Sequence, residues 1–434
     1  MIPIPVQAIF DIGKTNKKLY LFDDEAQIQW QTSTQFPVVE DEDGYPSDDL
    51  ESIVSWMRTT IFALLSDGQW DIQSINFSAY GASLVYLDEQ GERLPLFINY
   101  LKPYPKDLSD TFFSKYGPVL NFSRETASPF LGMLNSGLQI YWLKYIKPDW
   151  FARVRYVLHF PQYLSYIFTQ TPVAEYTSIG CHTGMWNYEK GDYHHWIDAE
   201  GLRKYLPALK PSDTWLEVPF ESKKIKVGTG LHDTSASLIP YLASEDEPFL
   251  LLSTGTWSVC VNPFSTDVLS EEDLENDCLN FLGKEGQQVR AARLFLGREH
   301  EIQVDRLGAH YDIDKVQILK LDWDEESYVK AIQADRFPFQ LEYLDSTASE
   351  HQDGVSPEKW EYAYYQLMDQ LLPLQIAAIR RAAGKQHIPR LIIEGGFVHN
   401  QIFFHLLQKM LPDWEVSISK ISGGSARGVW ELGK

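Results

Sequence analysis

A turn rich in residue types that bind phosphate lies near the start of the chain. It combines an acidic residue, a glycine, a hydroxyl and lysines, in the order Asp11, Gly13, Lys14, Thr15, Asn16 and Lys17. Lysine side chains and backbone N–H groups bind anionic oxygens, and a carboxylate binds a divalent metal or its waters. The turn therefore predicts a site for a nucleotide phosphate chain with its Mg²⁺, with Asp11 on the metal side.

Two apolar runs flank this turn and predict the hairpin that positions it. The runs span residues 6–10 and 19–22, and a glycine turn between short β-prone runs is typical of a β-hairpin. Gly13-Lys14-Thr15 resembles the end of a Walker A loop, but the first glycine of that loop would fall at Ala8 inside the strand. A strand also follows where a helix should, so we exclude a P-loop. A solvated hairpin with a lysine-rich tip remains the alternative.

A later glycine turn repeats the same arrangement. Thr254, Gly255 and Thr256 follow the apolar run 249–252, and a second β-prone run continues at 259–261. Hydroxyl and backbone donors in such a turn can hold a phosphate chain from the opposite side. The strand–glycine–strand order at the start of the chain therefore recurs, as in an internal repeat.

Two other glycine turns differ in the groups they offer. Gly395 and Gly396 follow the apolar run 391–393 without any cationic donor, and Asn400 lies just beyond. Bare glycine backbone, which has no Cβ in the way, suits a flat adenine ring. The other turn is at Gly230, three residues before Asp233, and its pattern of strand followed by glycine is less clear.

Composition restricts the classes of partner. The 434 residues contain 44% hydrophobic and 23% charged residues, which is ordinary for a folded globular chain. A net charge of -22 argues against nucleic acid or an anionic membrane as a partner. Cys181, Cys260 and Cys278 have no metal-ligand spacing and are too few for a disulfide scaffold. With no apparent signal peptide and no apolar run of about 20 residues, we expect a cytoplasmic protein. The sequence leaves a homodimer open.

Alternating strands and helices predict an α/β fold with two similar lobes and a cleft between them. The acidic segment 244–248 is the best candidate boundary, which gives domains 1–243 and 244–434. Ligands are expected at the carboxyl ends of strands that face the cleft. We predict a helix capped by Ser47 or Asp48 and ending near residue 66, three helices within 131–168, and a long helix over 358–383. The segment 271–353 gives no clear prediction.

The order of the glycine turns resembles the FGGY family of carbohydrate kinases, which have two ribonuclease H-like lobes of the actin/Hsp70/sugar kinase type. The resemblance covers most of the chain, from Asp11 to about Gly428. Residues 11–16 are similar to the family's first phosphate loop, residues 252–256 to its second, and residues 394–400 to its adenosine loop.

The resemblance also implies a catalytic aspartate. Residues 230–236 are similar to the family segment that carries it, which implies that Asp233 accepts a proton from the sugar hydroxyl and lies near the Mg²⁺ with Asp11. Residues 78–82 fall where the family has a sugar-contacting stretch. The family's aspartate-containing sugar segment is represented here only by residues 98–102, without an aspartate. The implied sugar contacts are Ala79, Tyr80, Gly81, Tyr100, His232 and Asp233.

The implied activity is ATP-dependent phosphorylation of a ketose. His232-Asp233-Thr234 and Gly255-Thr256-Trp257-Ser258 are closest to rhamnulokinases and fuculokinases, which favours a 6-deoxyketose such as L-rhamnulose or L-fuculose. Other ketoses or polyols of the xylulose, ribulose or glycerol type are the alternative. A non-catalytic actin-like nucleotide-binding protein is a third interpretation, and it would not need the His232-Asp233-Thr234 segment.

Structural roles compete with the functional ones at several positions. Asp233 is also a candidate helix N-cap, and Asp11 a candidate turn residue. We expect His232 to be a hydrogen-bonding partner rather than a second base. Cys181-His182 with His194-His195 has the residue types of a metal site, but we favour a surface loop with two histidines.

Overall fold

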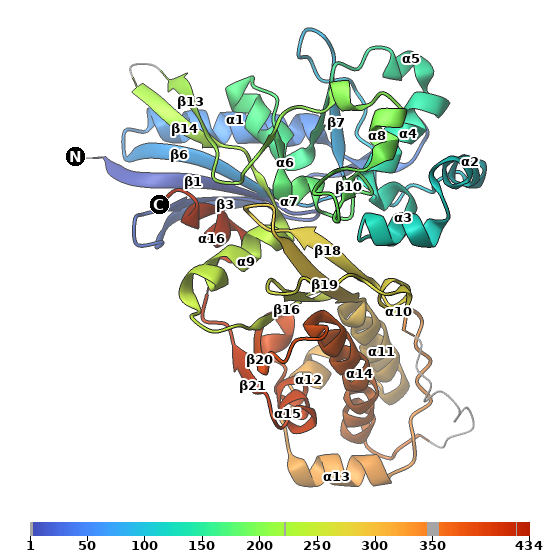
Figure 1. Cartoon of the computed structure of the whole chain (residues 1–434). Coiled ribbons are helices and arrows are strands. Elements are labelled where there is room, and N and C mark those ends of the chain that lie inside the picture. The colour runs from blue at the N-terminus through green and yellow to red at the C-terminus, as the bar shows by residue number, and fades with distance from the viewer. Residues whose placement is uncertain (1–2, 221–222, 345–355, 422) are drawn as a thin grey trace.

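Two mixed β-sheets, one in each lobe, organise this computed structural model, which describes residues 3–220, 223–344, 356–421 and 423–434 (Figure 1). The first sheet has the order β13-β14-β6-β1-β2-β3, with β15 paired to β6, and the second has the order β18-β19-β17-β16-β20-β21. The first contains β1 (Ile4–Ile12), β2 (Lys17–Phe22), β3 (Ile28–Thr34), β6 (Trp70–Ala79), β13 (Trp215–Phe220), β14 (Lys223–Gly228) and β15 (Leu231–His232). The second contains β16 (Leu250–Thr254), β17 (Ser258–Asn262), β18 (Cys278–Leu282), β19 (Gln288–Leu294), β20 (Arg390–Gly395) and β21 (Glu415–Ile418).

The predicted repeat of strand, glycine turn and strand is confirmed by the pairing of both hairpins. In the first lobe β1 is antiparallel to β2 and parallel to β6, and β2 continues antiparallel to β3. In the second, β16 is antiparallel to β17 and parallel to β20, and β17 continues antiparallel to β19. Each lobe is thus built on the same strand arrangement, and the predicted two-lobed α/β fold is confirmed.

Two helices join the lobes. Helix α9 (Asp233–Ser244) and helix α16 (Gly424–Glu431) lie between the sheets in Figure 1 and pack against each other. On one side, Ile239 of α9 and Trp430 of α16 are buried with Ile9 and Phe22 of the first sheet. On the other side, Tyr241 of α9 is buried in a core formed largely by the second sheet. The end of the chain therefore returns to the first lobe.

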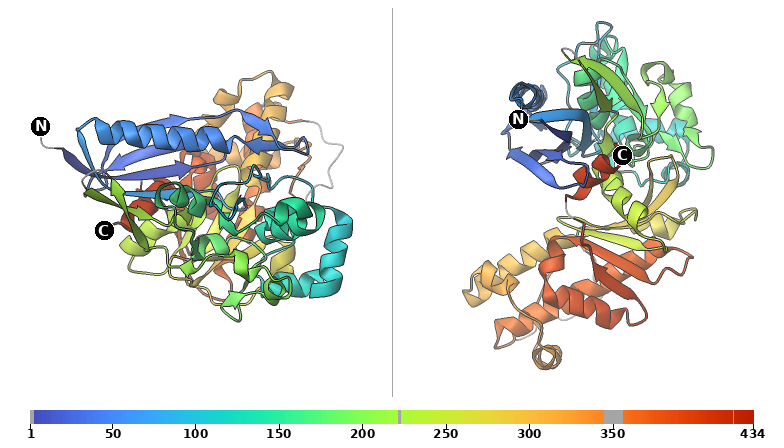
Figure 2. Two further views of the ribbon diagram at one scale, coloured as in Figure 1. Left: turned by 90° about the horizontal axis from the view of Figure 1, so that it is seen from above. Right: turned by 90° about the vertical axis from the view of Figure 1, so that its left-hand side faces the viewer.

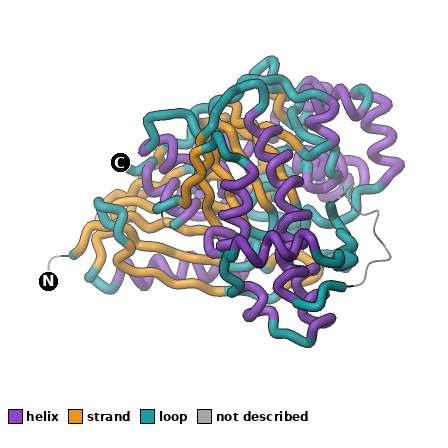
Figure 3. The backbone as a smooth tube through the Cα atoms, turned by 90° about the horizontal axis from the view of Figure 1, so that it is seen from below, coloured by secondary structure: helices purple, strands orange, loops and turns teal. Residues whose placement is uncertain are grey.

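Helices cover the sheets of both lobes (Figures 2 and 3). Helix α1 (Leu50–Ser66) covers the first sheet, and α14 (Trp360–Ala383) covers the second. The first lobe also carries β4 (Val38–Glu40), β5 (Pro46–Asp48), β7 (Leu84–Leu87), α2 (Lys106–Tyr116), α3 (Val119–Glu125), α4 (Ser136–Ile146), α5 (Pro148–Phe151), β8 (Tyr156–His159), α6 (Phe160–Thr169), β9 (Ala174–Glu175), α7 (Tyr176–Ile179), β10 (Trp186–Asn187), β11 (Asp192–Tyr193), α8 (His195–Ala199) and β12 (Leu209–Lys210). The second also carries α10 (Glu271–Glu275), α11 (Leu296–Tyr311), α12 (Lys315–Leu319), α13 (Glu325–Gln333) and α15 (Gln401–Met410). No helix within these described ranges is both long and apolar enough to cross a membrane.

Several local predictions need correction. The side chain of Asp49, not of Ser47 or Asp48, caps α1 by accepting a hydrogen bond from the backbone N–H of Ser52 at 3.0 Å. Asp48 instead ends β5. The region 131–168 holds α4, α5 and the start of α6, but strand β8 separates the last two and pairs with β7. The long helix was predicted correctly, and begins at Trp360 after Pro357.

Candidate active site

The first glycine turn sits at the end of the β1–β2 hairpin. The backbone N–H of Gly13 donates to the carbonyl oxygen of Asn16 at 3.0 Å, which closes the turn. Thr15 and Asn16 form its exposed tip, and the Asn16 side chain accepts a hydrogen bond from the Gln35 amide at 2.8 Å. These two residues therefore offer their backbone to solvent, at the edge of the site.

Asp11 lies beside this turn and contacts the far end of the chain. The hydroxyl of Ser425, in the first turn of α16, donates to Asp11 Oδ1 at 2.8 Å. Burial raises the pKa of Asp11, and the negative charge of Asp233 raises it further, against the opposing hydrogen bond from Ser425. The two aspartates are thus close enough to repel each other. Asp11 belongs to β1 and is more than a turn residue.

The two lysines of the turn share one carboxylate. The ammonium groups of Lys14 and Lys17 both pair with Asp48, which is 3.5 Å from Lys17 Nζ. Asp48 also accepts a hydrogen bond from the Tyr80 hydroxyl at 2.9 Å. The Lys14 ammonium lies 5.1 Å from the ring centre of Tyr80 and 5.1 Å from that of Tyr100. The structure therefore brings both lysines to the predicted sugar contacts, and neither is an unpaired phosphate donor.

The predicted sugar segment packs closely on the segment that carries Asp233. Ala79 ends β6 and pairs in register with His232 of β15. At Gly81 an added Cβ would lie 2.5 Å from the sulfur of Cys181 and 3.1 Å from the ring of His232. Only glycine allows this approach. The strand pairing and the glycine together place the Tyr80 segment beside the first residue of α9.

Asp233 is the first residue of α9, so the N-cap interpretation is wrong and the cap position belongs to His232. Its carboxylate accepts a hydrogen bond from the Thr234 backbone N–H at 2.6 Å, and no lysine or arginine pairs with it in the described chain. Burial raises its pKa to about 6, although 37% of the side-chain surface stays accessible. This is a carboxylate in a partly open, poorly solvated position, ionised at neutral pH and more basic than usual.

His232 connects Asp233 to a buried thiol. His232 Nε2 lies 3.3 Å from Asp233 Oδ1 and 3.1 Å from the sulfur of Cys181. Burial lowers the pKa of His232 to about 3, so the ring is neutral. A neutral ring at this position matches the expectation of a hydrogen-bonding partner, since it would be a poor base.

The glycine turns of the second lobe form a separate group of residues. Thr254 is buried, donates its hydroxyl to the carbonyl of Glu394 at 2.5 Å and accepts from the backbone N–H of Phe397 at 3.1 Å. Gly395 has φ +90°, and an added Cβ would lie 1.9 Å from the carbonyl oxygen of Thr254. The Thr254 hydroxyl therefore ties the two turns together, and only glycine allows their close approach.

The other predicted nucleotide contacts of the second lobe are of two kinds: some are exposed, and one is held by internal hydrogen bonds. Gly255, Thr256, Gly395 and Gly396 are exposed, which leaves their backbone accessible to a ligand. Asn400 caps α15 by accepting from the Phe403 N–H at 3.0 Å, and its amide donates to the Tyr364 hydroxyl at 2.7 Å. Its predicted adenosine contact thus competes with two internal hydrogen bonds.

The metal site that Cys181-His182 and His194-His195 could have formed together, which we did not favour, does not assemble. Cys181 and His182 join His232, whereas donor atoms of His194, His195 and Glu125 lie within 4.8 Å of one another. The surface-loop interpretation is wrong for His194, which is 1% exposed and caps α8.

Three residues of this site could not be predicted from the sequence. Asp48, Ser425 and Cys181 reach the group around Asp11 and Asp233 through the contacts described above. For Ser425 the one available signal was the pair Gly423-Gly424, which precedes a short apolar segment.

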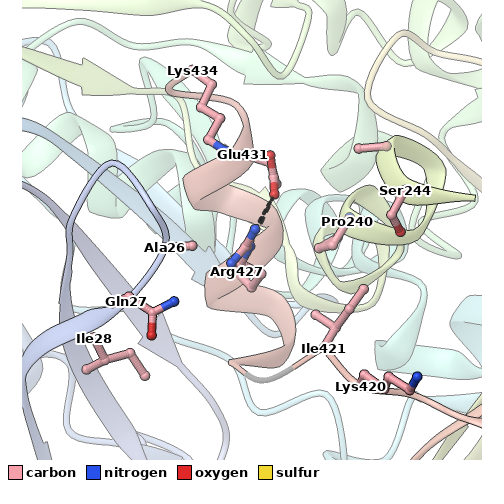
Figure 4. Close-up of a pocket in the computed structure, with 11 residues that line it drawn as sticks. Ala26, Gln27, Ile28, Pro240, Ser244, Lys420, Ile421, Arg427, Glu431 and Lys434 are labelled. Atoms are coloured by element: carbon pink, nitrogen blue, oxygen red, sulfur yellow. Dashed lines mark hydrogen bonds and ion pairs between the residues drawn. The ribbon is translucent and has the colours of Figure 1, made fainter.

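A pocket of about 740 Å³ lies on the exposed side of α16 (Figure 4). It is lined by Ala26, Gln27, Ile28, Pro240, Ala243, Ser244, Lys420, Ile421, Arg427, Glu431 and Lys434. The turn at Ala26 follows Phe22, whose partner across the hairpin is Gln7, whereas the Gly13 turn lies at the opposite end of both strands. The pocket is therefore separate from the group around Asp233.

Comparison with known proteins finds a family whose two domain models match the chain. Residues 6–239 match the N-terminal domain of the FGGY family of carbohydrate kinases, and residues 246–434 match the C-terminal domain of carbohydrate kinase FGGY. Among solved structures, a carbohydrate kinase from Novosphingobium aromaticivorans is 22% identical, with a TM-score of 0.82 over 98% of this chain and 93% of its own.

Two more distant structures share the fold. A ligand-bound xylulose kinase from Lactobacillus acidophilus is 14% identical, with a TM-score of 0.79 over 99% of this chain and 89% of its own. Plasmodium falciparum glycerol kinase with ADP is 15% identical, with a TM-score of 0.76 and the same coverage. At these identities the likeness shows the two-lobed sugar kinase fold of the actin/Hsp70 type.

Proposed function

The chain belongs to the FGGY family of carbohydrate kinases, and from this premise we propose that it transfers the γ-phosphoryl group of ATP to a hydroxyl of a ketose, with Asp233 as the general base. The observation that carries the proposal is the position of Asp233. Its carboxylate is partly open to the surface, has a pKa raised to about 6 by burial, and lies near enough to Asp11 that its charge raises the pKa of Asp11. A base of this kind suits an acceptor alcohol at neutral pH.

The transfer step needs few protein groups. Asp233 accepts the proton of the sugar hydroxyl as that oxygen forms a bond to the γ-phosphorus, and the bond to the β-phosphate oxygen breaks to release ADP. Phosphoryl transfer depends mainly on positioning and on stabilising charge, so one base with donor-rich turns is sufficient. The exposed backbone at Gly255 and at Gly395 supports nucleotide binding by the second lobe, as does the ADP in the glycerol kinase structure.

The acidic residues fit a divalent cation. Asp11 and Asp233 raise the energy of each other's ionised form, and oxygen ligands of this type are those that Mg²⁺ prefers. A bound Mg²⁺ would relieve this repulsion and neutralise part of the phosphate charge. Ser425 would keep the Asp11 carboxylate oriented through its hydrogen bond of 2.8 Å.

We propose a 6-deoxyketose such as L-rhamnulose or L-fuculose as the substrate. Besides the resemblance of residues 232–234 and 255–258 to kinases of these sugars, the aromatic pair beside Asp233 supports this choice. The rings of Tyr80 and Tyr100 lie 6.4 Å apart edge to face, and the half-buried Tyr100 ring has carbon atoms that a methyl group could contact. The second candidate is a ketose or polyol of the xylulose, ribulose or glycerol type, favoured by the xylulose and glycerol kinases among the similar structures.

A substrate panel tests the proposal. ADP release is measured with Mg²⁺–ATP and, in turn, L-rhamnulose, L-fuculose, D-xylulose, D-ribulose and glycerol. We expect the highest kcat/KM with one of the two 6-deoxyketoses. A higher value with xylulose, ribulose or glycerol would select the second candidate, and ADP release that no ketose or polyol stimulates would overturn the proposal for both.

A further inference from the structure

A chain of short contacts runs from the protein interior to Asp233. It starts at the backbone carbonyl of Leu134, which lies 3.2 Å from Nδ1 of His182. Nε2 of the same ring lies 3.3 Å from the sulfur of Cys181, and that sulfur lies 3.1 Å from Nε2 of His232. The last link, from His232 Nε2 to Asp233 Oδ1, is 3.3 Å. Cys181 is fully buried, and His182 and His232 are nearly so.

The first contact fixes the positions of the protons. A carbonyl oxygen can only accept, so His182 carries its proton on Nδ1 and donates to Leu134. Burial lowers the pKa of His182 well below its usual value, so this ring is neutral and its Nε2 is an acceptor. The Cys181 thiol then donates to His182, and the cysteine sulfur is left to accept. His232 fills this acceptor position on the sulfur by donating a proton carried on its Nε2.

From this order we propose that Cys181 and His182 are positioning residues, which hold His232 in the tautomer that carries its proton on Nε2, the ring nitrogen 3.3 Å from Asp233 Oδ1. The Nε2–H donates to the Cys181 sulfur, and Asp233 Oδ1 lies 3.3 Å from the same nitrogen, so the carboxylate has a protonated nitrogen rather than a lone pair as its neighbour. The inference rests on the proposed role of Asp233 as the base that faces the acceptor alcohol. In the opposite tautomer an Nδ1–H would donate to the Ser235 hydroxyl at 3.5 Å, and the lone pair on Nε2 would repel the carboxylate.

The backbone around His232 is held by the same segment of the chain. The His232 N–H donates to the Thr177 hydroxyl at 3.0 Å, and that hydroxyl donates to the buried carboxylate of Glu175 at 2.7 Å. The His232 ring also packs 5.5 Å from the ring of Phe281 in the second lobe. Residues 175–182 therefore fix both the backbone and the ring of His232. A ring with so little freedom keeps its Nε2 atom at a fixed position beside Asp233.

Removing the thiol tests the role of Cys181. We expect Cys181→Ala to lower kcat roughly tenfold, the value of the neutral hydrogen bond that fixes the His232 ring, while KM for the sugar and for ATP changes less than about twofold. Cys181→Ser keeps a donor and an acceptor and should recover most of kcat. Cys260→Ala is the matched control, because it truncates an equally buried cysteine in the second sheet and should leave kcat unchanged.

The two outcomes of this comparison are distinct. A positioning role is supported if Cys181→Ala lowers kcat with little change in KM and Cys181→Ser restores kcat. Equal activity of Cys181→Ala and the wild type overturns it, as does a loss in Cys181→Ser as large as that in Cys181→Ala while Tm stays within about 2 °C.

The tautomers can be measured without any kinase assay. In protein labelled with ¹⁵N-histidine, ¹⁵N–¹H correlation spectra assigned with single His→Gln variants should show His182 protonated on Nδ1 and His232 on Nε2. A His232 ring protonated on Nδ1 overturns the inference. Because this result does not depend on turnover, it separates a failure of the positioning role from a failure of the proposed kinase reaction.

Discussion

Three aspartates near the first glycine turn have different surroundings. Asp48 is paired with Lys14 and Lys17, and Asp11 accepts a hydrogen bond from Ser425. Asp233 has no lysine or arginine partner among the described residues; it lies beside the neutral ring of His232 and accepts hydrogen bonds from the backbone N–H and the hydroxyl of Thr234. Burial without a cationic partner raises the pKa of Asp233 to about 6, which suits a proton acceptor at neutral pH.

This difference predicts the effect of Asp233→Asn. The amide keeps the shape of the side chain but cannot accept the sugar proton, so kcat should fall by roughly 10²–10⁴-fold. Affinity for ATP, measured by isothermal titration calorimetry, should stay within about threefold because the nucleotide turns are unchanged. If Asp233→Asn keeps full kcat, Asp233 is not the base. Asp71→Asn, which removes an exposed pair with Lys223 at the opposite end of β6 from Ala79, is a matched control that should keep kcat.

The contacts of Lys14 predict that it affects binding of the sugar rather than of ATP. Its ammonium lies against Tyr80 and Tyr100 and is paired with Asp48, all within the proposed sugar site. We therefore expect Lys14→Met to raise KM for the sugar about tenfold and to change the affinity for ATP little. Steady-state kinetics with each substrate varied in turn measures both. If ATP binding weakens more than sugar binding, Lys14 serves the phosphate chain, as the sequence first suggested.

The missed residues share a physical cause. Asp48 lies 34 residues from Lys14, Ser425 lies 414 residues from Asp11, and Cys181 lies 51 residues from His232. Local pattern gives no information about such contacts, since they exist only after the strands have paired. The sequence could nevertheless point to Asp11, because it ends a short β-prone run at a glycine turn and that pattern is local, whereas Asp233 was implied by the family resemblance of residues 230–236.

At the scale of elements, the hairpins and long helices could be read from the sequence, whereas short strands could not. Helix α14 extends over 24 residues with a continuous buried face, so its periodicity is unmistakable. Strand β8 has four residues, and its partner β7 lies some 70 residues earlier in the chain. A four-residue apolar run between helices fits a helical pattern as well as a strand, so only pairing decides.

Helices α2, α4 and α8 meet at a single buried carboxylate. Glu200, 1% exposed, accepts hydrogen bonds from Lys115 and Lys144, both at 2.5 Å, and from Tyr145 at 2.8 Å. Burial acts to raise the pKa of Glu200, but these hydrogen bonds outweigh it and lower the pKa to about 2. A carboxyl group with a depressed pKa contributes stability that is fully present above its unfolded pKa, about 4.3, and is lost as pH falls towards 2.

Glu200→Gln should therefore lower the free energy of unfolding by about 3 kcal/mol at pH 7, because two lysines lose their buried partner. The difference from wild type should shrink as pH drops below about 4.3. Urea unfolding at pH 7, 5 and 3.5 measures it. Glu217→Gln, which removes an exposed pair with Lys224, is the control and should have little effect. A difference that stays constant down to pH 3.5 would contradict the assignment.

At the scale of the whole molecule, the two lobes repeat one strand arrangement, and the proposed site lies where they meet. Helix α9 begins with Asp233 and then passes between the sheets, with Ile239 packed on the first and Tyr241 on the second. The Ser235 hydroxyl also donates to the carbonyl of Leu282 in the second lobe at 3.2 Å. Any change in the angle between the lobes therefore acts on the helix that carries the proposed base.

The packing of α16 on α9 predicts that the lobes unfold together. At Gly428 an added Cβ would lie 1.7 Å from the carbonyl oxygen of Ala236, so Gly428→Ala forces the helices apart. We expect a cost of about 3 kcal/mol and a fall in Tm of about 5 °C. The calorimetric trace should keep one transition, because α9 is part of both cores and neither lobe buries it alone.

Gly44→Ala is the matched control for this substitution. It lies in an exposed turn with nothing within 4 Å of an added Cβ, although φ is +78°. It should therefore cost only the strain of a left-handed alanine, about 1 kcal/mol. If Gly428→Ala instead splits the trace into two transitions, the lobes are independent folding units that α9 merely connects. Asp233 would then be positioned by the first lobe alone. A change in the angle between the lobes would not move Asp233 through α9.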